Sequence, residues 1–306
     1  MKYAFSLAAL AAIATAGPIV KRQSTGITDV GILNYALTLE HLEDKFYREG
    51  LANYTQADFI AAGFPDPFYD NLKEISYDET THVSFLATAL GAAGVEECTY
   101  SFPSTDAASF VALASVLEGV GVSAYLGAAG QIANKDYLTD AGSILTIESR
   151  HSAYIRSSLK ESPFPQPFDD PLTFDEVYTL AAGFIVSCPS ANDDKPQLPL
   201  KAFPPIALGT TGTIASGQTI TLLTPGYTLA AVDGNTPIYA AFIAVTGPIY
   251  DVATAVEGGF TAVVPGGVNG QSYVVLTACK DRVTDDTVAA GPAIVEITNP
   301  YPNVAA

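Results

Sequence analysis

The hydrophobic positions in the first two thirds of the chain recur at helical spacing. Apolar side chains lie three and four residues apart in four long stretches, which places them on one face of a helix in each case. We therefore predict four helices, over residues 27–50, 65–91, 104–130 and 137–160. A fifth, shorter helix opens at Thr173 and Glu176, which have the spacing of a capping box, and it ends at Cys188-Pro189. The pattern predicts a four-helix bundle with one additional helix.

The hydrophobic period changes after residue 205. Short runs rich in Val, Ile, Thr and Tyr are separated by Gly, Pro, Asn and Asp, which is typical of a small β-sandwich of the immunoglobulin-like kind. The runs cover residues 218–223, 238–245, 260–264, 272–278 and 293–297. Residues 198–205 are proline-rich and without pattern. We therefore predict an α+β chain of two domains, with a helical domain over 23–197, a linker over 198–205 and a β-sandwich over 206–306.

In two of the predicted helices, the stripe of apolar residues along one face is interrupted by a Glu-x-x-His pair. Glu79 and His82 interrupt one stripe, and Glu148 and His151 interrupt another. A buried ionised carboxylate costs several kcal/mol unless it is paired, neutralised or bound to a metal. Two further glutamates lie on apolar stripes and are each followed by a tyrosine seven residues later. These are Glu40 with Tyr47, and Glu118 with Tyr125. The chain therefore contains a twofold internal repeat of Glu followed by Glu-x-x-His.

This repeat supplies the ligand types of a dinuclear carboxylate centre, in which two helices give one Glu each and two give a Glu-x-x-His pair. Four carboxylates and two neutral imidazoles balance two divalent cations. We predict Glu40, Glu79, His82, Glu118, Glu148 and His151 as metal ligands. Such a set suits iron or manganese, and zinc can compete. For either pair alone, a solvated glutamate beside a core histidine is the alternative, but two of the three histidines have the pattern.

Three residues near the predicted ligands need a separate assignment. Glu43 competes with Glu40 as the ligand from the first helix, and we favour Glu40 because Glu118 repeats its seven-residue offset to a tyrosine. Tyr47 and Tyr125 are then candidates for hydrogen bonds to ligand carboxylates. The helix that contains Glu118 also contains several glycines, each costing about 1 kcal/mol relative to Ala. They indicate close approach of a neighbour near Glu118, or simple sequence drift; they are Gly119, Gly121, Gly127 and Gly130.

The same residues resemble a known family. The run from Leu33 through Glu40 to Tyr47, the run Leu117-Glu118 to Tyr125 and the two Glu-x-x-His pairs are similar to secreted fungal ferritin-like proteins of the stress-response and desiccation-related group. The resemblance extends over about residues 27–190, and the remainder is similar to a β-rich tail that some members carry. It implies a ferritin-like four-helix bundle. It implies much less about the reaction.

The N-terminal residues have the features of a secretory signal. Met1-Lys2 precedes an apolar run over residues 3–14 and a small-residue site at 14–16, and the dibasic pair Lys21-Arg22 follows. We expect a signal peptide and pro-segment over residues 1–22 and a secreted or cell-wall protein without membrane insertion. Asn53 begins the sequon Asn-Tyr-Thr, which we place in a glycosylated surface loop. The 14 basic and 32 acidic residues argue against nucleic acid as a partner.

The three cysteines allow three pairings in an oxidising compartment. Cys98 follows the second helix and Cys188 ends the fifth, so we predict a bond between these two and leave Cys279 free or intermolecular. Two functions are then open, and the alternative to both is a metal-free bundle in which the four buried carboxylates share protons. The first is redox chemistry at the metal pair with a small-molecule oxidant, dioxygen or peroxide. The second is non-catalytic metal binding or stress protection at the cell surface, with the β-sandwich as support.

Overall fold

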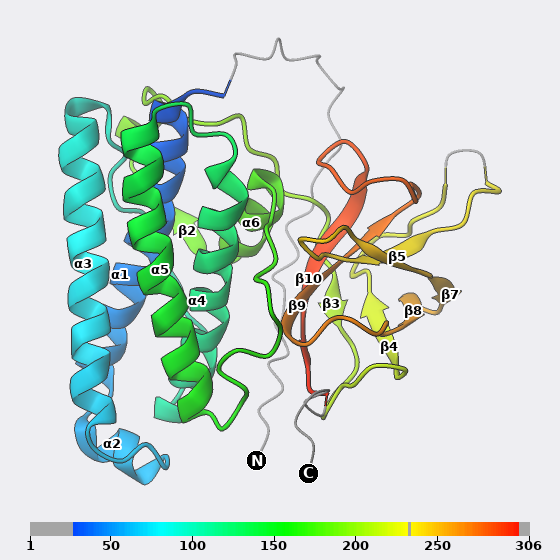
Figure 1. Ribbon diagram of the computed structural model, residues 1–306, viewed down its shortest axis with the longest axis horizontal. Helices are drawn as coiled ribbons and strands as arrows, with labels where there is room; N and C mark the ends of the chain where they lie inside the picture. Colours follow the sequence, from blue (N-terminus) through cyan, green and yellow to red (C-terminus); the bar gives the residue numbers. More distant parts are fainter. Residues whose placement is uncertain (1–26, 232–233, 300–306) are drawn as a thin grey trace.

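The computed structural model describes residues 27–231 and 234–299, and it places a helical bundle beside a two-sheet β-sandwich (Figure 1). The predicted signal peptide and the Lys21-Arg22 site lie outside the described residues. The predicted fold class, α+β with a helical region followed by a β-rich region, is confirmed. All five predicted helices and all five predicted strands are present, and most ends are shifted by a few residues. The predicted end of the fifth helix at Cys188-Pro189 is wrong, because that helix ends at Ala181 and residues 185–187 form a strand that pairs with residues 99–100.

Four long helices form the bundle: α1 (Asp29–Asn53), α3 (Phe68–Leu90), α4 (Ala107–Ala129) and α5 (Lys135–Ser158). Three of them begin at a side chain that accepts a hydrogen bond from the first turn, namely Thr28, Asp106 and Asn134. Along the bundle α1 packs mainly against α3, and α4 packs against α5. The crossover from α3 to α4 contains a 3₁₀ turn (Gly91–Ala93) and the short strand β1 (Thr99–Tyr100).

Shorter elements complete the helical region. The helix α2 (Gln56–Ala61), which the periodicity did not predict, joins α1 to α3, and α6 (Phe174–Ala181) begins at the predicted capping box of Thr173 and Glu176. Strand β2 (Ile185–Ser187) pairs with β1, and a 3₁₀ turn (Ser190–Asn192) follows it. Asn53 is exposed as expected, but it is the last residue of α1 and not part of a loop.

The helix α4 is long and apolar enough to cross a membrane by length and composition alone. However, 78% of its most apolar window is buried within the protein, as is common for the central helix of a bundle. Three of its glycines make room for neighbours. A Cβ atom on Gly127 would lie 1.8 Å from the Leu172 carbonyl oxygen, and one on Gly119 would lie 2.5 Å from the Gln271 side chain. Gly130 has open space around it, so close approach does not explain that glycine.

The β-sandwich has two antiparallel four-stranded sheets. One has the order β3-β4-β8-β7 and the other β10-β9-β5-β6. This is the A-B-E-D and G-F-C arrangement of immunoglobulin-like domains, with β6 added beside the C strand. The strands are β3 (Ala207–Leu208), β4 (Thr219–Leu223), β5 (Tyr239–Phe242), β6 (Ile249–Val252), β7 (Thr254–Val256), β8 (Gly259–Val263), β9 (Gly270–Thr277) and β10 (Val288–Ile297).

The two regions share a hydrophobic core. Strand β9 is buried on both faces, because one face packs inside the sandwich and the other packs against the helices. Side chains of the sandwich that belong to the helical core include Ile243, Tyr273 and Val275. Leu198 and Phe203, from the segment interpreted as a linker, are also buried in this core. The sandwich is therefore packed directly onto the bundle, beside α4 and α6 (Figure 1).

The predicted disulfide between Cys98 and Cys188 is present, with the two Cα atoms 4.2 Å apart. It lies beside the β1–β2 pair, so it joins the crossover after α3 to the segment after α6 and does not join the two helix ends themselves. Cys279 is half-buried and forms no disulfide within the described part of the chain.

Candidate metal centre

All six predicted ligands meet in the middle of the bundle. Glu40 comes from α1, Glu79 and His82 from α3, Glu118 from α4, and Glu148 and His151 from α5. Every glutamate is at most 1% exposed, and the two histidines are 9% and 6% exposed. The six side chains point into the bundle because each one lies on the apolar face of its helix, at a position where the helical spacing would otherwise place a core side chain.

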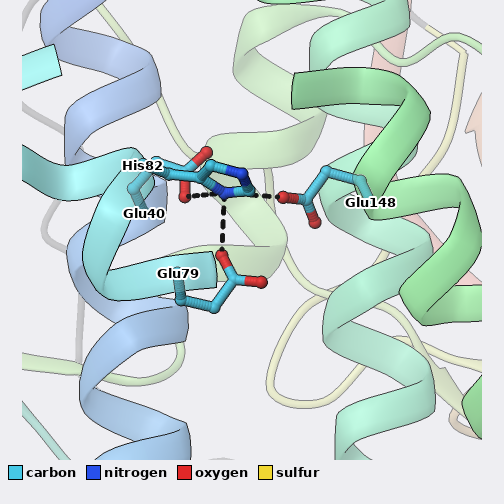
Figure 2. Close-up of side chains that lie close together, drawn as sticks. All are labelled: Glu40, Glu79, His82 and Glu148. Atoms are coloured by element: carbon cyan, nitrogen blue, oxygen red, sulfur yellow. Dashed lines mark hydrogen bonds and ion pairs between the residues drawn. The ribbon is translucent and has the colours of Figure 1, made fainter. Parts of the chain in front are cut away.

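His82 lies against three carboxylates at once (Figure 2). Its Nδ1 atom is 3.2 Å from Glu40 Oε2, 3.3 Å from Glu79 Oε2 and 3.3 Å from Glu148 Oε1. A ring nitrogen carries at most one hydrogen, so it cannot donate a good hydrogen bond to all three oxygens. The side chains converge on one point from three helices, which is the arrangement of a ligand shell.

His151 occupies the equivalent place on the other side of the cluster. Its Nδ1 atom is 3.0 Å from Glu79 Oε1 and 3.5 Å from Glu118 Oε2. Neither contact has hydrogen-bond geometry, because these three atoms have no hydrogen-bond partner among the described residues. The other ring nitrogen, Nε2, is 3.1 Å from Asp78 Oδ2. A carboxylate on the far nitrogen fixes the tautomer and orientation of a histidine that ligates a metal.

The two tyrosines bind ligand carboxylates across the bundle. The Tyr47 hydroxyl on α1 donates to Glu118 Oε1 on α4, and the Tyr125 hydroxyl on α4 donates to Glu40 Oε1 on α1. Each tyrosine therefore serves the glutamate of the other repeat. This reciprocal pairing accounts for the shared seven-residue offset, which places each phenol two helical turns beyond the glutamate of its own helix.

The cluster contains buried polar atoms that the protein does not satisfy. Both carboxylate oxygens of Glu148, one each of Glu79 and Glu118, and Nδ1 of His151 lack a hydrogen-bond partner among the described residues. A buried oxygen or nitrogen without a partner loses its hydration without compensation, at a cost of about 1–3 kcal/mol. Lone pairs left in this way are the donors that a cation would take up, so these residues fit a metal ion.

Without a cation, protons must balance the buried charge. Burial raises the pKa of Glu79 to about 7 even though its contacts with His151 and His82 lower it. Burial, together with the charge of Glu79, also raises the pKa of Glu148 well above its ordinary value. Burial would lower the pKa of His151, but the carboxylates of Glu118 and Glu79 outweigh it and raise that pKa to about 12. Burial also lowers the pKa of His82, but the contacts with carboxylates outweigh burial, and the pKa is raised.

The ligand atoms form two overlapping groups in which all atoms lie within 4.8 Å of one another. One group is Glu40, Glu79, His82 and Glu148, and the other is Glu79, Glu118, Glu148 and His151. Glu79 and Glu148 belong to both groups. These buried Glu and His groups could hold a metal ion.

Glu43 and Asp78 are close to the cluster but outside the predicted ligand set. Glu43 is 4% exposed, and it fills space left by Gly121 on α4, where a Cβ atom would lie 2.8 Å from Glu43 Oε1 and 3.1 Å from Glu148 Oε2. In the internal repeat Gly121 is the counterpart of Glu43, as Tyr125 is of Tyr47. The glycine thus breaks the repeat and admits one additional carboxyl group. Asp78 was not among the predicted residues, because its position directly before Glu79 gives no signal that its partner is a histidine of another helix.

Comparison with known proteins agrees with this geometry. Residues 28–161 match the model of the family described as Ferritin-like domain. The matched segment contains the four long helices and every residue of the cluster, so this part of the chain is ferritin-like. The fission yeast Schizosaccharomyces pombe has a similar protein named Protein rds1, which is 26% identical over 168 residues. That alignment covers 54% of this chain and spans about two fifths of the relative, 41% of its length.

Proposed function

We propose that the protein binds two divalent metal ions, iron or manganese, and carries out redox chemistry on dioxygen or peroxide. The observation that supports a pair of ions is the overlap of the two ligand groups at Glu79 and Glu148. Two shared carboxylates flanked by one Glu and one His on each side are the ligand set of dinuclear carboxylate centres in helical bundles. Zinc fits the same donors on affinity alone.

The surrounding residues have defined tasks in this proposal. A bound pair of iron or manganese ions supplies the electrons and the Lewis acidity that the side chains lack. Tyr47 and Tyr125 fix the outer carboxylates Glu118 and Glu40, and Asp78 orients the His151 ring. The apolar side chains around the cluster keep bulk water away, which strengthens every electrostatic interaction within it.

A second candidate is non-catalytic metal binding, for storage or protection. The observation in its favour is burial, since none of the four predicted carboxylate ligands is more than 1% exposed. The Cys98–Cys188 disulfide supports our further proposal that the protein works outside the cell or in the cell wall, because such bonds persist in oxidising compartments. Glycosylation of the exposed Asn53 belongs to the same proposal.

Elemental analysis of the purified full chain after loading with Fe(II) or Mn(II) tests the proposal. We expect about two ions per chain, and consumption of dioxygen or peroxide by the loaded protein. Fewer than one ion per chain with either metal would contradict the dinuclear centre. Full loading with no turnover of either oxidant would leave the non-catalytic function in its place.

A further inference from the structure

An apolar cavity of about 30 Å³ lies one helical turn from the metal centre. It is at the end of the bundle where α1 and α5 begin and α3 and α4 end, the upper end in Figure 1. All four long helices contribute to its wall. Ala36, Leu86 and Ile144 line it, and each lies four residues from a predicted ligand, namely Glu40, His82 and Glu148.

Tyr125 forms the part of the wall nearest the ligands. Its ring lines the cavity, while its hydroxyl group is engaged with Glu40. At the outer side, the wall contains Phe85, which is 46% exposed, and the exposed Ala89. The cavity therefore lies between the protein surface and a phenol that holds a predicted metal ligand.

The chemistry of the wall favours an apolar occupant. Almost all of the lining consists of aliphatic and aromatic carbon. The lining residues also include Asp140 and three tyrosines, but their polar atoms form only a small part of the wall, so a water molecule would lack the two to four polar partners that it needs. Hydrogen peroxide has the same need for hydrogen bonds. A small apolar molecule has none.

The size of the cavity also fits such an occupant. A single water molecule needs about 10–15 Å³ measured in this way, whereas a cavity that binds benzene measures about 150 Å³. A volume of about 30 Å³ is sufficient for a diatomic gas or a noble-gas atom.

The pocket at the other end of the bundle, of about 60 Å³, has a mainly polar wall that includes Glu49, Asn53 and Ser104, and Tyr47 does not line it. Phe46 and Phe110 stack with centroids 4.4 Å apart, and Tyr47 packs edge-on against Phe46 at 5.3 Å. The Tyr47–Glu118 hydrogen bond is therefore backed by packed rings, whereas the Tyr125–Glu40 hydrogen bond is backed by the cavity.

We propose that this cavity binds dioxygen and delivers it to the metal centre beside Tyr125. The inference rests on the proposed function and deepens it, because it selects dioxygen over peroxide as the small-molecule oxidant. Phe85 forms the outer wall, and Ala141 on α5, a half-buried residue of the lining, sets the free volume.

Xenon is a suitable probe, since it is apolar and of similar size to dioxygen. Crystals of the metal-free full chain under xenon pressure should show a xenon atom between Tyr125, Ile144 and Leu86. Ala141→Leu should abolish this site, because the larger side chain fills the space. Ala112→Leu, the same change at a half-buried position of α4 outside the lining, should retain it. Absence of xenon from the cavity of the unaltered protein would overturn the proposal, whatever the metal content.

Kinetics of the Fe(II)-loaded protein provide the second measurement. In a single turnover, in which the bound Fe(II) ions are the reductant, we expect the dioxygen concentration for half-maximal oxidation rate to rise about tenfold in Ala141→Leu, with the maximal rate and metal content unchanged, the signature of lost dioxygen binding. Phe85→Ala should lower this dioxygen concentration by opening the outer wall. An unchanged dependence on dioxygen in both variants would show that the gas arrives by another route. Failure to load metal would instead count against the proposed function, and the xenon result does not depend on loading.

Discussion

The two halves of the metal cluster have nearly the same sequence pattern and different surroundings. The half around His82 has three carboxylates against one ring nitrogen. The half around His151 has two carboxylates on one nitrogen and Asp78 on the other. By the internal repeat, the counterpart of Asp78 is Ile147, the residue before Glu148, and its side chain accepts no hydrogen bond.

The scaffold behind each half differs as well. Helices α1 and α3 lie on the side of the bundle away from the sandwich, whereas the sandwich packs beside α4 (Figure 1). The Tyr273 hydroxyl of β9 donates to the Gly119 carbonyl oxygen, 2.9 Å away and one residue after Glu118. On α5, the Arg156 guanidinium forms two hydrogen bonds with Glu296 of β10, at 3.0 and 2.8 Å.

This difference shows that a repeated ligand set need not give two equal sites. The helices that carry Glu118, Glu148 and His151 are fixed by a second region of the protein, and His151 is oriented by a carboxylate. Preorganised ligands lose less conformational freedom on binding. We therefore expect the ion on the His151 side to bind more tightly than the ion on the His82 side.

The largest effect should come from removing a carboxylate that both halves share. Glu79→Gln should reduce the metal content from about two ions to fewer than one per chain, because Glu79 belongs to both ligand groups. Without metal, the same variant should have a higher melting temperature than the unaltered protein, since a buried group that must hold a proton is replaced by a neutral amide. Elemental analysis and thermal unfolding measure the two effects.

The matched control for this change is Glu74→Gln, an exposed glutamate of the same helix. It should leave metal content and melting temperature unchanged. Retention of two ions by Glu79→Gln would show that the two halves bind independently and do not share this carboxylate.

Removing a ligand that belongs to one half should have the next largest effect. Glu118→Ala should reduce metal content to about one ion per chain and should leave the His82 half occupied, because Glu118 occurs only in the group of His151. Glu43→Ala should reduce metal content less, since Glu43 is outside both groups although it is buried beside them. An equal loss in the two variants would make Glu43 a ligand.

The fold could be predicted from sequence wherever a buried face was long enough to show its period. The five helices and the five main strands follow from such faces. The elements that were missed have no such pattern. Strand β7 is exposed at every residue, β6 is at best half-buried, and α2 has only six residues. The packing of the sandwich onto the bundle was also unpredictable, because the double burial of β9 gives the same apolar run whichever layer covers it.

The cluster could be predicted because metal ligands are costly residues on an apolar stripe. That cost marks Glu40, Glu118 and the two Glu-x-x-His pairs in a single sequence. Residues that only support the ligands leave no such mark. Asp78 is 40% exposed at its side chain, and nothing in its neighbourhood distinguishes it from a solvated surface residue. The role of Gly121 depends on Glu43, 78 positions away, and this relation emerges only when the two helices are packed.

A smaller effect is expected from Asp78→Asn, which tests the difference between the halves directly. Replacing the partner of a ligand histidine commonly lowers metal affinity 10–100-fold. We expect a loss within about that range for one of the two ions and little change for the other. Titration of the metal-free protein with Mn(II) under a competing chelator separates the two binding steps. The control is Asp70→Asn, an exposed aspartate of the same helix that pairs with Lys73. Equal weakening of both ions would contradict independent support of the His151 half.

The smallest effect is expected from a change on the side of the bundle against which the sandwich packs, at a residue that is not a predicted ligand. Glu176 is buried in α6, which packs against α4 and β10, and burial raises its pKa from 4.5 to about 7 although hydrogen bonds with Thr173 oppose this. Between these values the folded protein holds a proton that the unfolded chain has lost. The stability linked to Glu176 is therefore present below about pH 4.5 and is lost as the pH rises through 7.

Glu176→Gln keeps an acceptor for the Thr173 amide and cannot ionise. The free energy of unfolding of this variant should equal that of the unaltered protein at pH 4 and should exceed it by roughly 1–3 kcal/mol at pH 8. Chemical denaturation of the metal-free protein across this range, with the half-exposed Glu49→Gln as control, measures the difference. A stability difference that does not change between pH 4 and pH 8 would show that the pKa of Glu176 is the same in the folded and unfolded protein, which would contradict the shift caused by burial.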